Sequence, residues 1–147
     1  MIDILNRELL HMEDKLKQKN ITTKINVAIN AVAHADPNSV RIVVHNFLTN
    51  AIKFSNRNGL IEISAWLEDD ESVSFCLKDN GVGMRPEYLS TLFKSQVTSA
   101  TGTENESGTG MGLLFCKDLI EKQKGKIWAK SALGRGTELC FMLPAGH

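Results

Sequence analysis

The stretch from Val73 to Leu113 constrains the fold of this chain more than any other part of the sequence. It begins with an alternating strand pattern over 73–79 that ends in Asp79. By the two-residue period of a strand, Asp79 points to the same face as the apolar residues before it. A carboxylate there is costly unless something pairs with it. The chain must therefore place a buried, partnered acid at the end of a sheet strand.

The turn after this strand, Asp79-Asn80-Gly81-Val82-Gly83-Met84, allows two interpretations. In one, Asn80-Gly81 is a hairpin turn that Asp79 caps. In the other, the carboxylate binds a ligand: because it only accepts hydrogen bonds, it suits the amine of adenine and disfavours the carbonyl of guanine. Such a bond is worth roughly 1.5–3 kcal/mol. Since no alternating strand follows, the sequence favours the ligand site, with Gly81 and Gly83 allowing a base to approach the backbone.

A second glycine turn, Gly108-Thr109-Gly110-Met111-Gly112-Leu113, leads into a helical pattern over 113–124. Free amides and the positive end of a helix dipole form an anion site. The turn is neither a Walker loop nor a dinucleotide fingerprint. Between the two turns, residues 94–107 are mostly polar, which is typical of a lid or of a disordered loop. Phe93 would anchor this segment, and Lys94 would either reach a phosphate or remain solvated.

The remaining periodicities predict an α+β, two-layer sandwich with helices on one face of a mixed sheet. Strands and helices are segregated along the chain, and no internal repeat is visible. We expect helices over 2–18, 38–54 and 113–124, and strands over 21–29, 60–67, 73–79, 126–131 and 137–143. Asp36-Pro37 would open the second helix, and Gly134-Arg135-Gly136 would turn the last hairpin.

The apolar residues of the first helix leave two interpretations open. They recur at spacings of three and four, namely at Ile2, Leu5, Leu9, Met12 and Leu16. This stripe could pack on the sheet of its own domain. It could instead be the end of a coiled coil that leads to a partner domain.

The helix over 38–54 carries a polar stripe formed by Asn46, Asn50 and Lys53, which are spaced four and three apart. Asparagine is a mediocre helix former, so two of them a turn apart call for an explanation. Their amides could satisfy local backbone groups. Alternatively, a side-chain oxygen could bind a magnesium ion, which needs few protein ligands when phosphates are present, while the lysine contacts those phosphates.

Charge and cysteine content exclude several classes. The formal net charge is zero, which gives no indication of nucleic-acid or anionic-membrane binding, and no apolar run is long enough to span a membrane. The three cysteines, Cys76, Cys116 and Cys140, are far apart in sequence and lack metal-ligand spacing. We expect them to be buried free thiols in a reducing cytoplasm.

Together these motifs resemble the catalytic ATP-binding domain of bacterial sensor histidine kinases, within the wider family of gyrase, heat-shock chaperone, histidine kinase and MutL ATPases. The resemblance covers about residues 20–144. It implies a Bergerat-type fold, ATP and Mg²⁺ as cofactors, and a flexible ATP lid over about 85–110. Residues 1–19 would be a helix linking to an absent dimerisation domain, and residues 20–147 would be the catalytic domain.

The resemblance also implies a role for each motif residue. In the N box, Asn50 would bind magnesium, while Asn46 and Lys53 would be the catalytic residues beside the phosphates. The F box lacks the second phenylalanine that many members have. The remaining nucleotide-binding residues would be Asp79, Gly81 and Gly83 of the G1 box, Phe93 of the F box Leu92-Phe93, Lys94 after it, Gly108, Gly110, Gly112 and Leu113 of the G2 box, and Thr137 beside the adenine.

One position separates branches of the family. Hydrolysing members place a glutamate, the general base, where this chain has Asn46. The expected activity is therefore that of a protein-histidine kinase, which transfers phosphate to a histidine outside this chain, with a response regulator as the downstream partner. A hydrolysing ATPase and a regulatory nucleotide-binding module are the alternatives. The domain is expected in the cytoplasm without membrane contact of its own, although the parent protein could be membrane-anchored.

Overall fold

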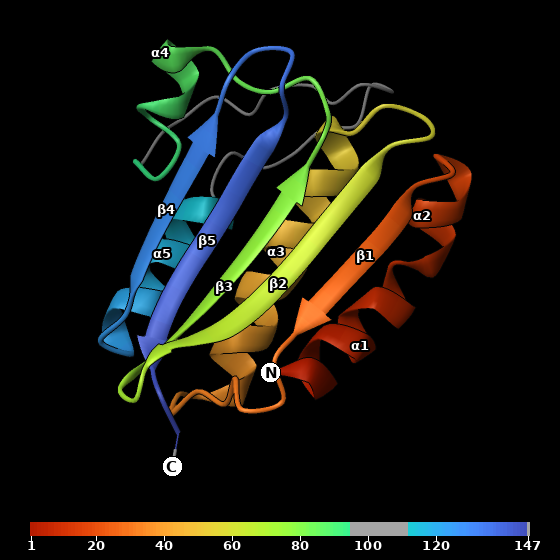
Figure 1. The fold of residues 1–147 in the computed structure, drawn as a ribbon. Coiled ribbons are helices and arrows are strands. Elements are labelled where there is room, and N and C mark those ends of the chain that lie inside the picture. The colour runs from red at the N-terminus through yellow and green to blue at the C-terminus, as the bar shows by residue number, and fades with distance from the viewer. Residues whose placement is uncertain (95–111, 147) are drawn as a thin grey trace.

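A single mixed sheet covered by helices on one face forms the framework of the molecule (Figure 1). The computed structural model describes residues 1–94 and 112–146. The sheet lies nearest the viewer in Figure 1, with helices α3 and α5 behind it. The two-layer α+β prediction is confirmed. The elements are α1 (Ile2–His11), α2 (Glu13–Gln18), β1 (Thr22–Val27), α3 (Pro37–Phe54), β2 (Leu60–Asp69), β3 (Ser72–Asp79), α4 (Pro86–Leu89), α5 (Gly112–Lys122), β4 (Lys126–Ser131) and β5 (Thr137–Pro144).

The strands follow the order β1-β2-β3-β5-β4. The pair β1–β2 is parallel, with α3 as the crossover between its strands, and the other three pairs are antiparallel. Two hairpins, β2–β3 and β4–β5, are joined through the β3–β5 ladder. The register of that ladder places Asp79 opposite Thr137, so the two predicted adenine residues meet at one end of the central strands.

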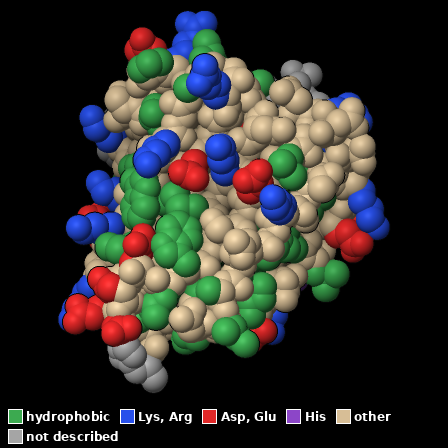
Figure 2. Space-filling view, in the orientation of Figure 1, with side chains coloured by type: hydrophobic (Ala, Val, Ile, Leu, Met, Phe, Trp, Pro, Cys, Tyr) green, Lys and Arg blue, Asp and Glu red, His purple; other side chains and the backbone are tan. Residues whose placement is uncertain are grey.

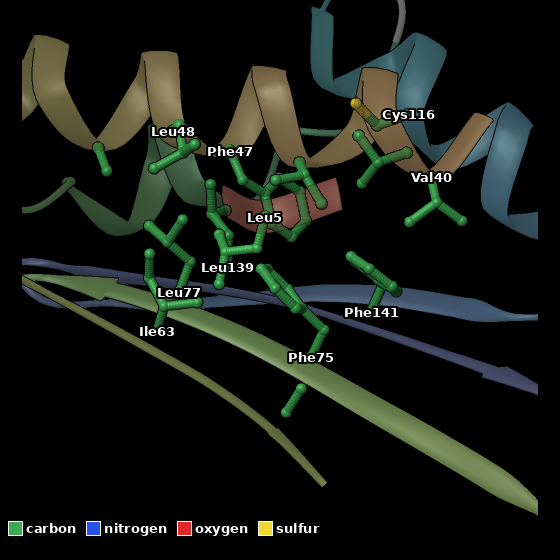
Figure 3. Close-up of a cluster of buried hydrophobic side chains, with 14 of the residues drawn as sticks. Leu5, Val40, Phe47, Leu48, Ile63, Phe75, Leu77, Cys116, Leu139 and Phe141 are labelled. Atoms are coloured by element: carbon green, nitrogen blue, oxygen red, sulfur yellow. The ribbon is translucent and has the colours of Figure 1, made fainter. Parts of the chain in front are cut away.

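Helix α3 is the main element of the helical layer that covers the sheet. It begins where predicted: the Asp36 side chain accepts hydrogen bonds from the amides of Asn38 and Ser39, and Pro37 occupies the first turn. Its apolar face packs on the sheet, and Phe47 meets Phe75 and Phe141 there (Figure 3). The rings of Phe75 and Phe141 stack at 4.9 Å between centroids. All seven predicted apolar residues of this helix are buried, namely Val40, Val43, Val44, Phe47, Leu48, Ala51 and Ile52.

The predicted N-terminal helix is two helices, α1 and α2, separated at Met12. Leu5 and Met12 are buried, but the stripe packs chiefly against α3 instead of lying on the sheet. Glu8 is also buried, and its Oε2 lies 3.1 Å from Nδ1 of His45 on α3. The first segment of the chain is therefore tied to the same helix that carries the asparagine stripe.

The edge strand β1 departs from the half-buried strand that its alternation predicts. It is shorter than expected, and Ile25 and Ile29 are 40% and 99% exposed. Ile25 pairs with Ile63, which is buried, so both belong to the helix-facing side of the sheet. The helical layer covers β2 more completely than it covers this edge. The alternation of apolar and polar residues predicted the strand correctly, but the position of β1 at the edge of the sheet determines how exposed its side chains are.

The face of the sheet without helices carries an alternating row of charges. Neighbouring residues across the five strands are Lys24, Glu62, Lys78, Glu138 and Lys130. Figure 2 shows acidic and basic side chains alternating across this face beside a hydrophobic patch. Opposite charges on neighbouring strands favour this register, since like charges directly opposite one another would be destabilising. We call this side of the sheet the open face.

The prediction of three free thiols is wrong for two of them. Cys76 and Cys140 face each other across the β3–β5 ladder and form a disulfide, with 4.2 Å between their Cα atoms. Cys116 on α5 is free and buried, as expected. The two bonded cysteines are 64 residues apart, and only the register of β3 with β5 brings them together. Sequence spacing alone could not show that register.

Candidate nucleotide site

The carboxylate of Asp79 lies at the end of β3 on the helix-facing side, and only 4% of the residue is exposed. Its Oδ1 accepts hydrogen bonds from the amide of Gly81 at 2.9 Å and from that of Thr137 at 3.3 Å. Burial raises the pKa of Asp79 to about 6, and these two hydrogen bonds oppose that rise. Within the described residues, both hydrogen bonds fall on Oδ1, so Oδ2 is available to accept from a ligand.

Gly81 joins the turn after β3 to the end of α3. The amide of Val82 donates to the carbonyl of Phe54 at 3.1 Å, and a Cβ on Gly81 would collide with that same carbonyl. Gly83 has a φ of +72°, and its missing side chain faces the carbonyl of Ala132. The sequence predicted that these glycines let a base approach. In the structure, their missing side chains allow close contact between segments of the protein's own backbone.

The β4–β5 hairpin closes the same end of the sheet, and Ser131 connects it to the turn. The Ser131 hydroxyl accepts from the amide of Met84 at 2.8 Å and donates to the carbonyl of Gly136 at 2.8 Å. It also lies 2.8 Å from the hydroxyl of Thr137. Sequence reasoning missed Ser131, because a serine at the end of a strand carries no signal until the hairpin is folded.

The asparagine stripe lies beside the apolar face of α3, with Asn46 and Asn50 half-buried and Lys53 buried. The amide of Asn46 donates to the carbonyl of Ile42 at 2.8 Å, the local bond that the structural alternative anticipated. Its Oδ1 faces Gly112, where a Cβ would collide with it. The first residue of α5 therefore lies directly against the first asparagine of the stripe.

Lys19 is a buried residue that the sequence analysis did not single out. Its ammonium group donates to the carbonyls of Ile52, Lys53 and Ser55 at 2.7, 3.2 and 3.0 Å. A cation here satisfies the carbonyls at the end of α3 and complements the negative end of its dipole. Lys19 thereby supports the turn of α3 that carries Lys53. A lysine that precedes a strand resembles any solvated lysine in sequence.

The other predicted residues fall into three groups. Leu113 is buried and Phe93 is partly buried, both against the hydrophobic core. Lys94 is exposed. Gly108 and Gly110 lie outside the described residues. The structure therefore brings together Asp79, Gly81 and Thr137 at one place, and Asn46 with Gly112 at another.

The residues present suit the groups that the resemblance implies. Asp79 offers a buried acceptor oxygen, as adenine recognition requires. Asn50 offers an amide oxygen, a hard ligand of the kind that magnesium accepts, one turn from both Asn46 and Lys53. The turn after β3 contacts Phe54, which follows Lys53 directly, so the two halves of the site are adjacent. The arrangement of sheet and helices is that of a two-layer sandwich of the Bergerat type.

Comparison with known proteins places the chain within a family. Residues 35–147 match the family described as histidine kinase-, DNA gyrase B- and HSP90-like ATPases. The chain belongs to this family. It is 33% identical over 137 residues to the adaptive-response sensory kinase SasA of Synechococcus elongatus, covering 93% of this chain and 35% of SasA. It is 32% identical over 152 residues to hybrid signal transduction histidine kinase B of Dictyostelium discoideum, covering 95% of this chain and 8% of that protein.

Solved structures have the same fold. The catalytic domain of histidine kinase ThkA superposes with a TM-score of 0.82 at 23% identity, covering 97% of this chain and 90% of that domain. Full-length ShkA in complex with AMPPNP gives a TM-score of 0.81 at 25% identity, covering 99% of this chain and 30% of ShkA. The chain spans about a third or less of the length of the first curated relatives. Within the described residues, no helix is long and apolar enough to cross a membrane.

Proposed function

We propose that this chain is the ATP- and Mg²⁺-binding catalytic domain of a two-component sensor histidine kinase. It donates the γ-phosphoryl group of ATP to a histidine on a dimerisation domain. The main supporting observation is the buried Asp79 carboxylate, which adjoins the end of the helix that carries Asn46, Asn50 and Lys53. Family membership and the naming of the curated relatives as kinases support the same conclusion.

Each residue has a stated part in this proposal. Asp79 Oδ2 accepts from the exocyclic amine of adenine, and Thr137 lies beside it. Asn50 holds the magnesium ion, which supplies charge neutralisation at the phosphates when bound. Lys53 contacts the phosphates, and Asn46 positions them next to Gly112. Gly108 and Gly110 complete the phosphate turn, Gly81 and Gly83 shape the adenine end, and Phe93, Lys94 and Leu113 border the lid.

The transfer needs no general base on this domain. The bond between the γ-phosphorus and the β–γ bridging oxygen breaks, ADP leaves, and a histidine nitrogen bonds the phosphorus while its proton passes to solvent. Positioning and charge neutralisation carry most of such a reaction. Asn46 donates its amide to Ile42 and is not a base, which supports transfer over hydrolysis.

The partners follow from this role. Residues 1–19 are proposed to link to the dimerisation domain, with residues 20–147 as the catalytic unit and a lid over about 85–110. A structure of ThkA in complex with the response regulator TrrA, with a TM-score of 0.79 at 21% identity, motivates a response regulator as the downstream partner. The domain is proposed to act in the cytoplasm, where its ATP is supplied.

Labelled ATP tests the proposal directly. The chain is incubated with γ-labelled ATP, Mg²⁺ and a separately produced dimerisation domain of the parent protein. We expect acid-labile label on a histidine of that domain. Free phosphate that depends on Asn46 would indicate the hydrolysing alternative. ATP binding without label or free phosphate would indicate the regulatory alternative.

Asn50→Ala is the matched variant for this assay. Because Asn50 is only half-buried, we expect the thermal unfolding curve to stay nearly unchanged. Magnesium-dependent transfer should fall by at least about a hundredfold, as expected when a charge-neutralising contact is lost. Full transfer activity in Asn50→Ala would refute the assignment of magnesium to this residue.

A further inference from the structure

The disulfide between Cys76 and Cys140 lies on the open face of the sheet. Both residues alternate with helix-facing neighbours such as Phe75 and Phe141, so their side chains project away from α3 and α5. No helix covers that face in Figure 1, which Figure 2 shows from outside. Cys76 is 7% exposed and Cys140 is 1% exposed. Cys76 is therefore the more exposed of the two bonded residues.

The disulfide is placed on the two strands that form the adenine end of the site. Cys76 precedes Asp79 by three residues, and Cys140 follows Thr137 by three. Three strand residues span about 10 Å. Asp79 and Thr137 are register partners, joined by the Thr137 amide and Asp79 Oδ1 at 3.3 Å. The covalent link therefore acts on the same ladder that holds the nucleotide-binding carboxylate in place.

The surroundings distinguish this pair from the third cysteine. The carboxylate of Glu138 lies within 4.8 Å of both bonded sulfurs, and the charge row places Lys78 and Lys130 beside Glu138. A thiolate that approaches the disulfide from solvent would therefore come close to the charged side chains of this row. Cys116 is buried on α5, and burial raises the pKa of its thiol to about 12. The Cys116 thiol is therefore expected to be unreactive, and it serves as an internal control for the thiol experiments.

We propose that Cys76 and Cys140 are a reversible thiol–disulfide site whose oxidation state controls how firmly β3 and β5 hold the nucleotide. The inference rests on the proposed function, because a disulfide in a cytoplasmic domain meets a thiol pool that reduces it. The reductant is a low-molecular-weight thiol or a dithiol protein. Its thiolate bonds the Cys76 sulfur, the S–S bond breaks, and Cys140 leaves with the electron pair and takes a proton. A second thiolate then releases Cys76 as a thiol, and the reductant becomes a disulfide.

Thiol counting and mass spectrometry test the site itself. After oxidised glutathione treatment and unfolding, we expect one reactive thiol, Cys116, and three after treatment of the native chain with a dithiol. In Cys140→Ser, oxidised glutathione should form a mixed disulfide at Cys76. In Cys76→Ser, Cys140 should react at least about tenfold more slowly, because access limits exchange. Three thiols after oxidation, or a native disulfide that resists a dithiol, would overturn the proposal.

Nucleotide affinity tests the coupling. We expect the apparent Kd for a fluorescent ATP analogue to rise about threefold on reduction, as when the binding-competent fraction falls to about a third. The double variant Cys76→Ser with Cys140→Ser should have the reduced affinity under both conditions, while Cys116→Ser should respond like the unmodified chain. Equal Kd values in both states would refute the coupling. No binding in either state would instead refute the proposed function, and the thiol count would still test the redox site.

Discussion

The proposed adenine end and the proposed phosphate end of the site are built in different ways. At the adenine end, three segments meet through backbone contacts: the end of α3, the turn after β3, and the β4–β5 hairpin. Glycines are required there because carbonyl groups occupy the space of a side chain. At the phosphate end, Asn46, Asn50 and Lys53 project as side chains from one helix, α3, and Gly112 lies directly against Asn46.

This difference predicts that the two ends of the site respond differently to mutation. Changes at the adenine end should alter folding and binding together, because the residues that hold the backbone there are also the ones proposed to bind the ligand. Changes at the phosphate end should alter transfer while leaving the fold intact, as expected for Asn50→Ala. The experiments below test that separation in order of decreasing expected effect.

Gly136→Ala should have the largest effect, because it places a Cβ against the carbonyl of Asp79 at a φ of +84°. We expect the free energy of unfolding to fall by about 3 kcal/mol or more, with nucleotide affinity lost as well. Gly134→Ala is the matched control, since Gly134 has a φ of +79° but no atom within 4 Å of the added Cβ. It should cost about 1 kcal/mol. Equal urea midpoints for both variants would show that backbone contact does not shape this end.

Asp79→Asn should remove binding while stabilising the empty domain. Because folding raises the pKa of this acid from 3.8 to about 6, ionised Asp79 destabilises the folded state at neutral pH. We expect the free energy of unfolding at pH 7.5 to rise by about 2–3 kcal/mol. The gain should shrink as the pH falls through about 6 and disappear below pH 3.8, where the acid is protonated in both the folded and the unfolded state. A stability difference between variant and parent that is independent of pH would contradict the burial argument.

Lys19→Met tests whether the N-terminal segment supports the phosphate end. The variant keeps an apolar stem but leaves the carbonyls of Ile52, Lys53 and Ser55 without the ammonium group. We expect a loss of about 2 kcal/mol in unfolding free energy. Lys17→Met is the control: Lys17 is exposed and pairs with Glu13 in solvent, so its loss should lower the unfolding free energy far less than the loss of Lys19. Chemical denaturation measures both, and equal costs would argue against a supporting role for Lys19.

Lowering the pH should weaken nucleotide binding through Asp79. With its pKa at about 6, the carboxylate is mostly ionised at pH 7.5 and mostly protonated at pH 5. We expect the Kd for an ATP analogue to rise about tenfold between these values, since a neutral carboxyl binds the adenine amine poorly. Calorimetry across this range measures the change, and a flat profile would place adenine recognition elsewhere.

Local patterns predicted most of the elements because they depend on neighbours in sequence. The cap at Asp36, the apolar face of α3 and the burial of Asp79 all follow from spacing. Features that depend on strand register or on distant contacts were not predictable in this way. The Cys76–Cys140 bond requires the β3–β5 register, and Ser131 acquires its role only when the hairpin meets the turn.

The same limit applies to the two sides of the sheet. The row of alternating charges on the open face combines one residue from each strand, so no local window contains it. Ile25 follows the strand period but lies at an edge that the helices cover incompletely. Sequence periodicity indicates which side chains share a face, whereas the order of strands decides how well that face is covered.

The β3–β5 ladder has a consequence for the evolution of chain length. It joins two hairpins, so the segment that connects β3 to β4 begins and ends at positions that the sheet already fixes. The entropic cost of closing a loop grows only with the logarithm of its length, about 0.6 kcal/mol for each doubling. Insertions and deletions between α4 and α5, which leave the buried face of α5 unchanged, should therefore be thermodynamically cheap. Homologous domains can vary the length of that stretch while keeping the five strands and their register unchanged.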